Sequence, residues 1–215
     1  MIVAAIETNW NGNFQLLDRM VMDCSIMGID YVKFQCLSKW KIERHPELDW
    51  YREASVTRSN IDKIDRICHN KHIEWFATPY YPEAVEMLEP YVDMYKIRYD
   101  DRLNHEIIQK CFGTGKKTII STDKPNIVPN EGKLIHEIYC IPKYPTDYGE
   151  LNFDMVRTMK GYSNHCLDPL AVLKAYRLGA EYIEFHVTSD SSKFTIDNKV
   201  SFNMGQVEEI MEWIK

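Results

Sequence analysis

Short runs of apolar, β-branched residues alternate along this chain with segments in which apolar residues recur every three or four positions. Residues 2–6 predict a strand. Residues 14–27 predict a helix, because Met20 and Cys24 fall on one apolar face and Gly28 provides a stop. The same pattern predicts further strands at 30–34, 73–77, 93–97, 117–121, 135–140, 161–163 and 182–185, and further helices at 60–70, 82–88, 105–112, 153–159, 169–178 and 205–214.

Eight strands, most of them followed by a helix, predict parallel pairing with right-handed crossovers. Such units can close as a (β/α)8 TIM barrel of the α/β class, and an open doubly wound sheet is the alternative that strand counting leaves open. Residues 123–133 contain two prolines and a glycine, so we expect a reduced fifth helix. No break in composition marks a second domain, and residues 1–215 are expected to form a single barrel domain. The polar stretch 36–57 is expected to be a long loop over one rim.

Composition narrows the class of protein. The 215 residues carry 26 Lys+Arg against 32 Asp+Glu, a net charge of −6, which argues against nucleic acid or an anionic membrane as a partner. No apolar run approaches the ~20 residues that span a bilayer, and the first residues do not resemble a signal peptide. The six cysteines form no CxxC pair, so we expect reduced, mostly buried thiols in a cytoplasmic protein.

In a parallel barrel, chemistry takes place at the C-terminal ends of the strands. Lysines are the least expected residues there, because a buried ammonium is costly unless it meets an anion. Either lysine alone could instead extend to solvent. Lys33 and Lys96 at equivalent positions, with Ser121 and Ser163 nearby, favour an anionic ligand such as phosphate or carboxylate. The polar or ionisable residues at the strand ends are Glu7, Asn9, Lys33, Gln35, Thr78, Lys96, Arg98, Ser121, Thr122, Tyr144, Ser163, His165 and His186.

Two histidines mark the ends of the seventh and eighth predicted strands. His165 and His186 are one strand–helix–strand unit apart, which places them on neighbouring strands of a barrel. A lone histidine has a hydrogen-bonded structural role more often than a catalytic one. Two imidazoles on adjacent strands can share one divalent metal, with carboxylate, water or substrate completing its coordination.

At these residues the sequence resembles a known family. The fragments that carry the resemblance occur in order over essentially the whole chain: Asn9-Trp-Asn-Gly12, Val32-Lys-Phe-Gln35, Ala77-Thr-Pro-Tyr80, Tyr95-Lys-Ile97, Ile120-Ser-Thr122, Tyr144-Pro-Thr146, Gly161-Tyr-Ser-Asn-His165 and Glu184-Phe-His-Val-Thr188. Together they resemble the sialic acid synthase (N-acetylneuraminate synthase) family. The resemblance implies a (β/α)8 barrel, which in the family is usually followed by a small antifreeze-like domain that this sequence lacks.

The resemblance also implies an activity. It is that of a transferase that condenses phosphoenolpyruvate with an N-acylmannosamine-type or other aldose in nonulosonic acid and surface carbohydrate biosynthesis. The implied partners are these small molecules and a divalent metal ion, Mn2+ or Mg2+, and the resemblance allows a homodimer. The implied metal ligands are His165 and His186. The implied substrate-binding residues are Lys33, Lys96, Thr78, Ser121, Tyr144, Ser163 and Asp197.

The departures from the family pattern concentrate at the sugar end. The first-strand glutamate of the family falls on Ala5, and Trp10 replaces a histidine. Asp101 stands where the family has a glutamate, one methylene longer. The expected catalytic residues are therefore Lys33, for charge neutralisation, and Glu7 or Asp101, for proton transfer. A diverged non-catalytic barrel, or a different lyase that binds a sugar or phosphorylated small molecule, stays open as an alternative.

Glu7 gives the sharpest expectation. If residues 5 and 7 lie on one strand, both side chains point into the barrel, because side chains alternate between faces. The Glu7 carboxylate then reaches the mouth, and a salt bridge to Lys33 is the alternative to a catalytic role.

Overall fold

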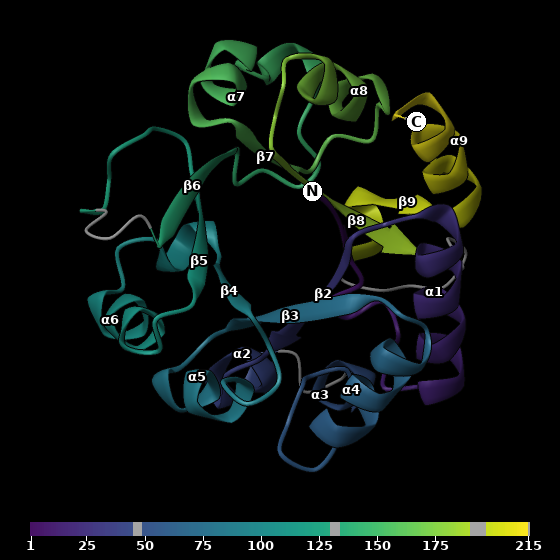
Figure 1. Ribbon diagram of the computed structural model, residues 1–215, viewed down its shortest axis with the longest axis vertical. Coiled ribbons are helices and arrows are strands. Elements are labelled where there is room, and N and C mark those ends of the chain that lie inside the picture. The colour runs from purple at the N-terminus through teal and green to yellow at the C-terminus, as the bar shows by residue number, and fades with distance from the viewer. Residues whose placement is uncertain (45–48, 130–133, 190–196, 215) are drawn as a thin grey trace.

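The computed structural model describes residues 1–44, 49–129, 134–189 and 197–214 of the chain. Parallel strands form a ring at its centre, and helices pack around the ring (Figure 1). Because β8 pairs with β1 as well as with β7, the first eight strands close into a barrel. The predicted TIM barrel is confirmed, and the open-sheet alternative is wrong. The strands are β1 (Ile2–Ala5), β2 (Tyr31–Cys36), β3 (Glu74–Pro79), β4 (Met94–Ile97), β5 (Lys117–Thr122), β6 (Ile135–Cys140), β7 (Gly161–Asn164), β8 (Tyr182–Thr188) and β9 (Ser201–Asn203).

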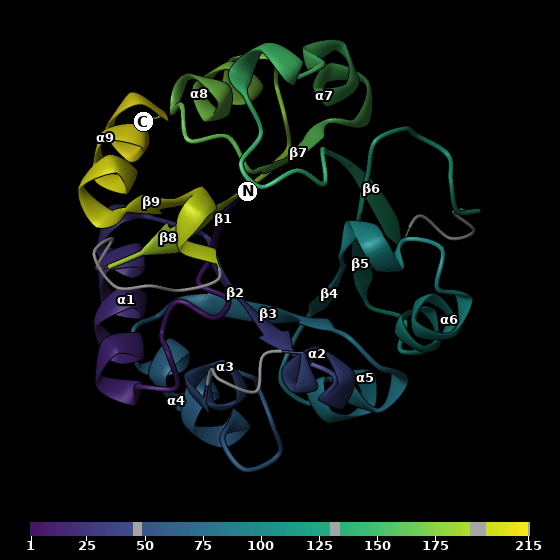
Figure 2. The ribbon, with the colours of Figure 1, turned by 180° about the vertical axis from the view of Figure 1, so that it is seen from behind.

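The helices cover the outside of the ring in chain order, as both ribbon views show (Figures 1 and 2). They are α1 (Phe14–Met27), α2 (Lys39–Glu43), α3 (Asp49–Glu53), α4 (Ile61–Asn70), α5 (Pro82–Leu88), α6 (His105–Gly113), α7 (Phe153–Met159), α8 (Leu170–Arg177) and α9 (Met204–Ile214), with short 3-10 turns η1 (Tyr99–Asp101), η3 (Tyr148–Glu150) and η4 (Asp197–Val200). The predicted bounds of three helices, 14–27, 82–88 and 153–159, agree with the structure.

Helix α1 shows why helix bounds could be predicted from the sequence. The Asn13 side chain accepts hydrogen bonds from the backbone N–H groups of Gln15 and Leu16, which would otherwise lack partners at the helix start. At the other end, Gly28 adopts a left-handed conformation with φ 78°, which glycine reaches without a steric cost. Both ends of the helix are therefore encoded locally.

Two expectations need correction. Residues 36–57 are not simply a loop, because they contain α2 and α3, each only five residues long and too short for an apolar period. Strand β8 is longer than the predicted 182–185, because β9 pairs with its last three residues. His186 therefore lies within β8 rather than after it. Between β5 and β6, the described residues 123–129 and Leu134 contain no helix, as expected for the reduced fifth crossover; residues 130–133 lie outside the described part.

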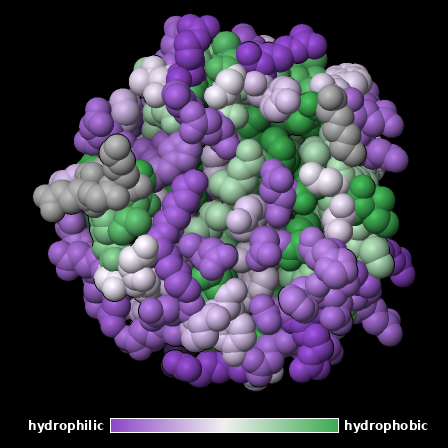
Figure 3. Space-filling model, in the orientation of Figure 1, coloured by the Kyte–Doolittle hydropathy of each residue, from purple (hydrophilic) through white to green (hydrophobic). Residues whose placement is uncertain are grey.

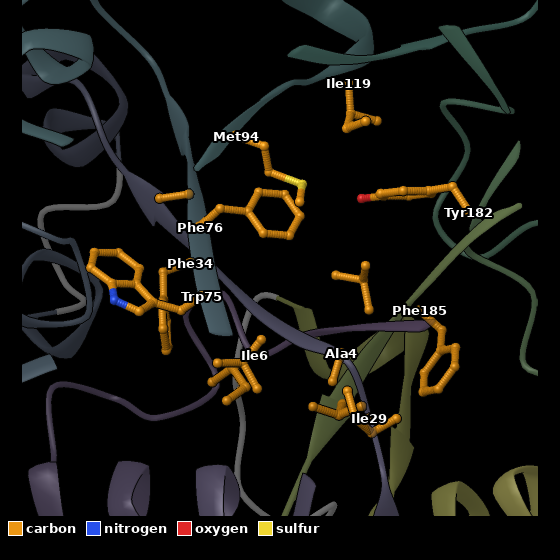
Figure 4. Close-up of a cluster of buried hydrophobic side chains, with 14 of the residues drawn as sticks. Ala4, Ile6, Ile29, Phe34, Trp75, Phe76, Met94, Ile119, Tyr182 and Phe185 are labelled. Carbon is orange, nitrogen blue, oxygen red and sulfur yellow. The ribbon is translucent and has the colours of Figure 1, made fainter. Parts of the chain in front are cut away.

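Inward and outward side chains alternate along the strands, and apolar residues fill the closed end of the barrel. Figure 4 shows Phe76 of β3 and Tyr182 of β8 pointing toward each other across the interior. Trp75, the neighbour of Phe76, packs edge-on against Phe34 at a ring-centroid distance of 5.8 Å. Phe76 and Tyr182 are fully buried, so side chains fill the barrel interior and it is not a pore. Trp75 and Phe34 are buried on the outer face of the strands.

The surface is that of an ordinary globular domain. Hydrophilic residues cover much of the face in Figure 3, and hydrophobic residues show in patches between them. All six cysteines are buried and none is bonded to another, which confirms the prediction of buried thiols. No helix in the described residues is long and apolar enough to cross a membrane.

Candidate active site

A cavity of about 480 Å3 opens at the C-terminal ends of the barrel strands. Its volume lies in the usual range for small-molecule sites, about 300–1,000 Å3. Residues from every part of the chain meet there, because each strand of a parallel barrel ends at the same rim. The cavity is lined by ten of the eleven residues that the sequence nominated: Glu7, Lys33, Thr78, Lys96, Ser121, Tyr144, Ser163, His165, His186 and Asp197.

Asp101, expected to take part in proton transfer, is the exception. It lies in the short turn η1 and does not line the cavity. Its Oδ2 lies 2.5 Å from Arg98 Nε, so Arg98 holds the carboxylate. The 3-10 turn presents the neighbouring Asp100 to the cavity instead.

The two lysines converge on one point, as expected, but that point is a glutamate of the protein. Lys33 Nζ lies 2.6 Å and Lys96 Nζ 3.2 Å from Glu184 Oε1. Ser163 donates a hydrogen bond of 3.1 Å to the same oxygen, and the Tyr182 hydroxyl donates to Oε2. All five side chains are buried. Glu184 is therefore the centre of a buried polar network.

Sequence reasoning missed Glu184, although a signal was present. Residues 182, 184 and 186 alternate on one strand, so an inward His186 implies an inward Glu184. An acidic residue inside a barrel needs a cation, and the two nominated lysines supply it. The lysines hold the pKa of Glu184 well below its usual range despite its burial. Burial itself lowers the pKa of Lys96, and Glu184 opposes this effect.

Glu7 points into the mouth, as predicted, but for a different reason. Strand β1 ends at Ala5, so residue 7 is not on the strand and the alternation argument is wrong. The backbone turns inward at Glu7, which has φ 48°, a conformation that only a few per cent of non-glycine residues adopt. Its Oε1 lies 2.7 Å from Lys33 Nζ, so the salt-bridge alternative is present in the structure. The other carboxylate oxygen, Oε2, is buried and has no hydrogen-bond partner in the part of the chain that the structure describes.

The environment of Glu7 raises the pKa of its carboxyl group. Burial raises the pKa of Glu7 to about 7, against the opposing effect of Lys33, and Asp197 adds to the rise. A carboxyl group with this pKa can exchange a proton near neutral pH. Asp197 is itself held by Thr8, whose hydroxyl and backbone N–H donate hydrogen bonds of 2.5 and 3.2 Å to Oδ2. The loop after β1 thereby connects to η4.

His165 and His186 face each other, with ring centroids 5.5 Å apart. His165 Nδ1 donates a hydrogen bond of 3.0 Å to the Ile141 carbonyl, which leaves Nε2 as the free nitrogen. His186 Nδ1 is buried and has no hydrogen-bond partner among the described residues, and Asp197 Oδ1 lies 3.9 Å away. Burial lowers the pKa of both histidines to about 3, so both rings are neutral and can act as ligands.

These properties suit a metal ion. A buried, partnerless ring nitrogen and a second imidazole fixed by a carbonyl are the arrangement that metal-binding histidines adopt. Within the described residues, no group of three or more His, Cys, Asp and Glu side chains is placed to hold a metal. His165 and His186 are thus the two side chains that could hold an ion here, and further ligands would have to come from other molecules.

The outer wall of the cavity differs in composition from the inner part, which holds the two lysines, Glu184 and Glu7. Tyr144, 55% exposed, stacks over His165 at a centroid distance of 4.0 Å. On the opposite side, Arg98 lies over the ring of Tyr80 at 4.5 Å, and Tyr80 donates a hydrogen bond to Gln35. Aromatic rings and cations thus line the entrance; the other members of this wall are Lys41, Tyr51, Tyr99 and Lys199.

Comparisons with known proteins identify the family and the fold. The model of the NeuB family matches residues 20–215. An uncharacterized protein of Methanocaldococcus jannaschii is 25% identical over the whole chain and 69% of its own length. The N,N'-diacetyllegionaminic acid synthase of Campylobacter jejuni is 26% identical over the whole chain and 75% of its length. The crystal structure of a Leptospira borgpetersenii N-acetylneuraminic acid synthetase has the same fold, with a TM-score of 0.85 and 22% identity over 99% of this chain and 81% of that one.

Proposed function

Because the chain belongs to the NeuB family, we propose that it is a carbohydrate-biosynthesis enzyme that condenses phosphoenolpyruvate with an aldose. The aldose is of the N-acylmannosamine type or a related sugar. One observation carries the proposal: a pair of neutral histidines and a pair of buried lysines share one cavity. The histidines could bind a metal ion that contacts a carbonyl oxygen, and the lysines could bind an anion.

Phosphoenolpyruvate binds at the inner end of the cavity in this proposal. Lys33 and Lys96 would contact its phosphate and carboxylate, together with the hydroxyl groups of Thr78 and Ser121. The Ser163 hydroxyl donates its one proton to Glu184, so its role here would be to help hold that carboxylate. Glu184 does not consume the donors of the two lysines, because each ammonium has three N–H bonds. The carboxylate instead fixes both ammonium groups in position before the substrate arrives, which lowers the cost of ordering them on binding.

His165 and His186 would hold the divalent ion, Mn2+ or Mg2+. When bound, this ion supplies Lewis-acid polarisation of the aldehyde oxygen of the sugar. The bond to Ile141 keeps the His165 ring in the required orientation. Tyr144 covers the outer side of that ring and limits access of water to the pair.

The reaction balances with one water. Carbon 3 of phosphoenolpyruvate forms a bond to the aldehyde carbon, whose oxygen takes up a proton. Water adds its oxygen to carbon 2, and inorganic phosphate leaves as a ketone forms there. Glu7 would take a proton of that water through Oε2, which has no hydrogen-bond partner among the described residues. Its pKa of about 7 matches this task.

The test is phosphate release from phosphoenolpyruvate with a panel of aldoses, with and without Mn2+. The protein should release phosphate only when an aldose is present, and chelation should abolish the activity. His186→Ala should lower the rate by about 100-fold or more, because it removes a ligand of the ion. His105→Ala is the matched control, since His105 is exposed and does not line the cavity.

A wild-type protein that releases no phosphate with any aldose, in Mn2+ or Mg2+, would contradict the proposal. The cytoplasmic location, the single-domain organisation and the homodimer stay predictions of the sequence.

A further inference from the structure

Lys41 occupies an unusual position at the entrance of the cavity. It comes from α2, the short helix that follows β2 and lies beside the end of that strand (Figure 2). Its side chain is partly buried and lines the same cavity as the histidine pair. Arg98 also lines this part of the wall. Two cations therefore face one space at the outer end.

The two cations differ in how their charge is balanced. Arg98 forms ion pairs with Asp100 and Asp101, at 2.7 and 2.5 Å. The Lys41 ammonium has no hydrogen bond or ion pair with any residue in the described part of the chain. Lys199 lines the cavity too, but it is exposed and water solvates its charge.

An ammonium in this position carries an energetic cost. Burial lowers the pKa of Lys41, and the nearby Arg98 adds to the decrease, while Asp100 and Asp197 oppose it. Part of the hydration of the ammonium is lost, and no carboxylate of the described residues comes within ion-pair distance to replace it. A ligand anion at this point would offset both the lost hydration and the repulsion from Arg98.

We propose that Lys41, assisted by Arg98, binds an anionic group on the far end of the acceptor sugar. The preferred acceptor is then a phosphorylated aldose or a sugar acid rather than a neutral sugar. This inference rests on the proposed function, since it assumes that the aldehyde end lies at the histidine pair. Both ends belong to one continuous cavity of about 480 Å3, so one molecule can reach both.

The test compares neutral sugars with counterparts that carry an anionic group at carbon 6. Binding of mannose, glucose and N-acetylmannosamine would be measured by calorimetry against their 6-phosphates, and mannose also against mannuronate. Wild-type protein should bind at least one anionic member about tenfold or more tightly than its neutral partner. The phosphate and carboxylate arms identify which anion is preferred.

Lys41→Met should bring the ratio of the two affinities close to one, and Lys41→Arg should retain most of the preference. Lys39→Met is the matched control, because Lys39 lies on the same helix, is 90% exposed and pairs with Glu43 at 3.7 Å. It should leave the ratio unchanged. If no pair of sugars shows tighter binding of the anionic member, or if Lys41→Met keeps the preference, the inference is wrong.

The binding measurement and the activity measurement can contradict the anion site and the proposed function independently of each other. A Lys41-dependent preference without phosphate release from phosphoenolpyruvate supports the anion site and contradicts the proposed function. Phosphate release at equal efficiency with neutral and anionic sugars supports the proposed function and contradicts the anion site.

Discussion

The inner and outer ends of the cavity balance their positive charge in opposite ways. At the inner end, Lys33 and Lys96 are buried and meet the carboxylates of Glu184 and Glu7. At the outer end, Lys41 is partly buried and meets no carboxylate within ion-pair distance among the described residues. Full burial makes an unpaired charge too costly to keep, whereas partial burial allows it. The inner end is thus organised by the protein itself, and the outer end is left for a ligand to complete.

The largest expected effect comes from removing the shared carboxylate. Glu184→Gln would leave two buried ammonium groups close together with one fewer counter-charge. Breaking a buried ion pair in this way costs about 3–5 kcal/mol of unfolding free energy, measurable by urea denaturation. Glu181→Gln is the control, since its ion pair with Lys160 lies at the surface and should contribute nothing measurable. An unchanged stability of Glu184→Gln would show that the inner end does not depend on this carboxylate.

Glu7→Gln should come next, acting on turnover. The amide keeps the shape of the side chain but cannot accept a proton, so turnover should fall by about 100-fold or more. Phosphoenolpyruvate affinity should change less. Because ionised Glu7 is the proton acceptor, the wild-type rate should rise with pH and level off above about pH 7. If the rate of Glu7→Gln rises with pH in the same way, the rise reports the ionisation of another group and not that of Glu7.

Lys96→Met tests the anion role of the inner end. Loss of one charged donor should weaken phosphoenolpyruvate binding by about tenfold or more, as measured by calorimetry. Lys33 and Glu184 would still form their ion pair, so the fold should be retained. Wild-type affinity in this variant would mean that the inner lysines serve the network and not the substrate.

The smallest effect is expected at the outer end. Lys41→Met removes a charge that has no partner in the described protein, so stability should stay within about 0.5 kcal/mol of wild type. Thermal denaturation of Lys41→Met beside Lys39→Met measures the difference. A substantial loss of stability would show that Lys41 has a structural partner after all, and the contrast between the two ends would disappear.

Much of the barrel could be predicted because its elements follow local rules. Helix α1 has an apolar period of three to four residues and a cap at each end, and its bounds were predicted correctly. Helices α2 and α3 are too short for a period, and they were missed. Strand β9 was missed because its three residues are defined by pairing with β8, which no local pattern encodes.

The location of a site residue was predictable where its position on a strand determines it. It was less predictable where a backbone turn or an interaction partner determines it. His165 and His186 met as expected, since neighbouring strands bring them together. The turn at η1 brings Asp101 to Arg98, and no local pattern predicted that turn. Glu184 was overlooked because a single acidic residue in a mostly apolar strand does not by itself indicate a polar network. The network becomes evident when Lys33 and Lys96 are considered together with it.

The early end of β1 also has a consequence for the order in which this protein can fold. The loop after β1 is held by the last quarter of the chain: Thr8 bonds to Asp197, and Asn9 bonds to Val187 and Ser201. Contacts this far apart in sequence form late, because closing so long a segment has a large entropic cost. During synthesis, Glu7 cannot be fixed beside Lys33 and Asp197 until β8 and η4 have emerged. The mouth of the barrel is therefore completed only after Asp197, 189 positions from Thr8 in the sequence, has been made.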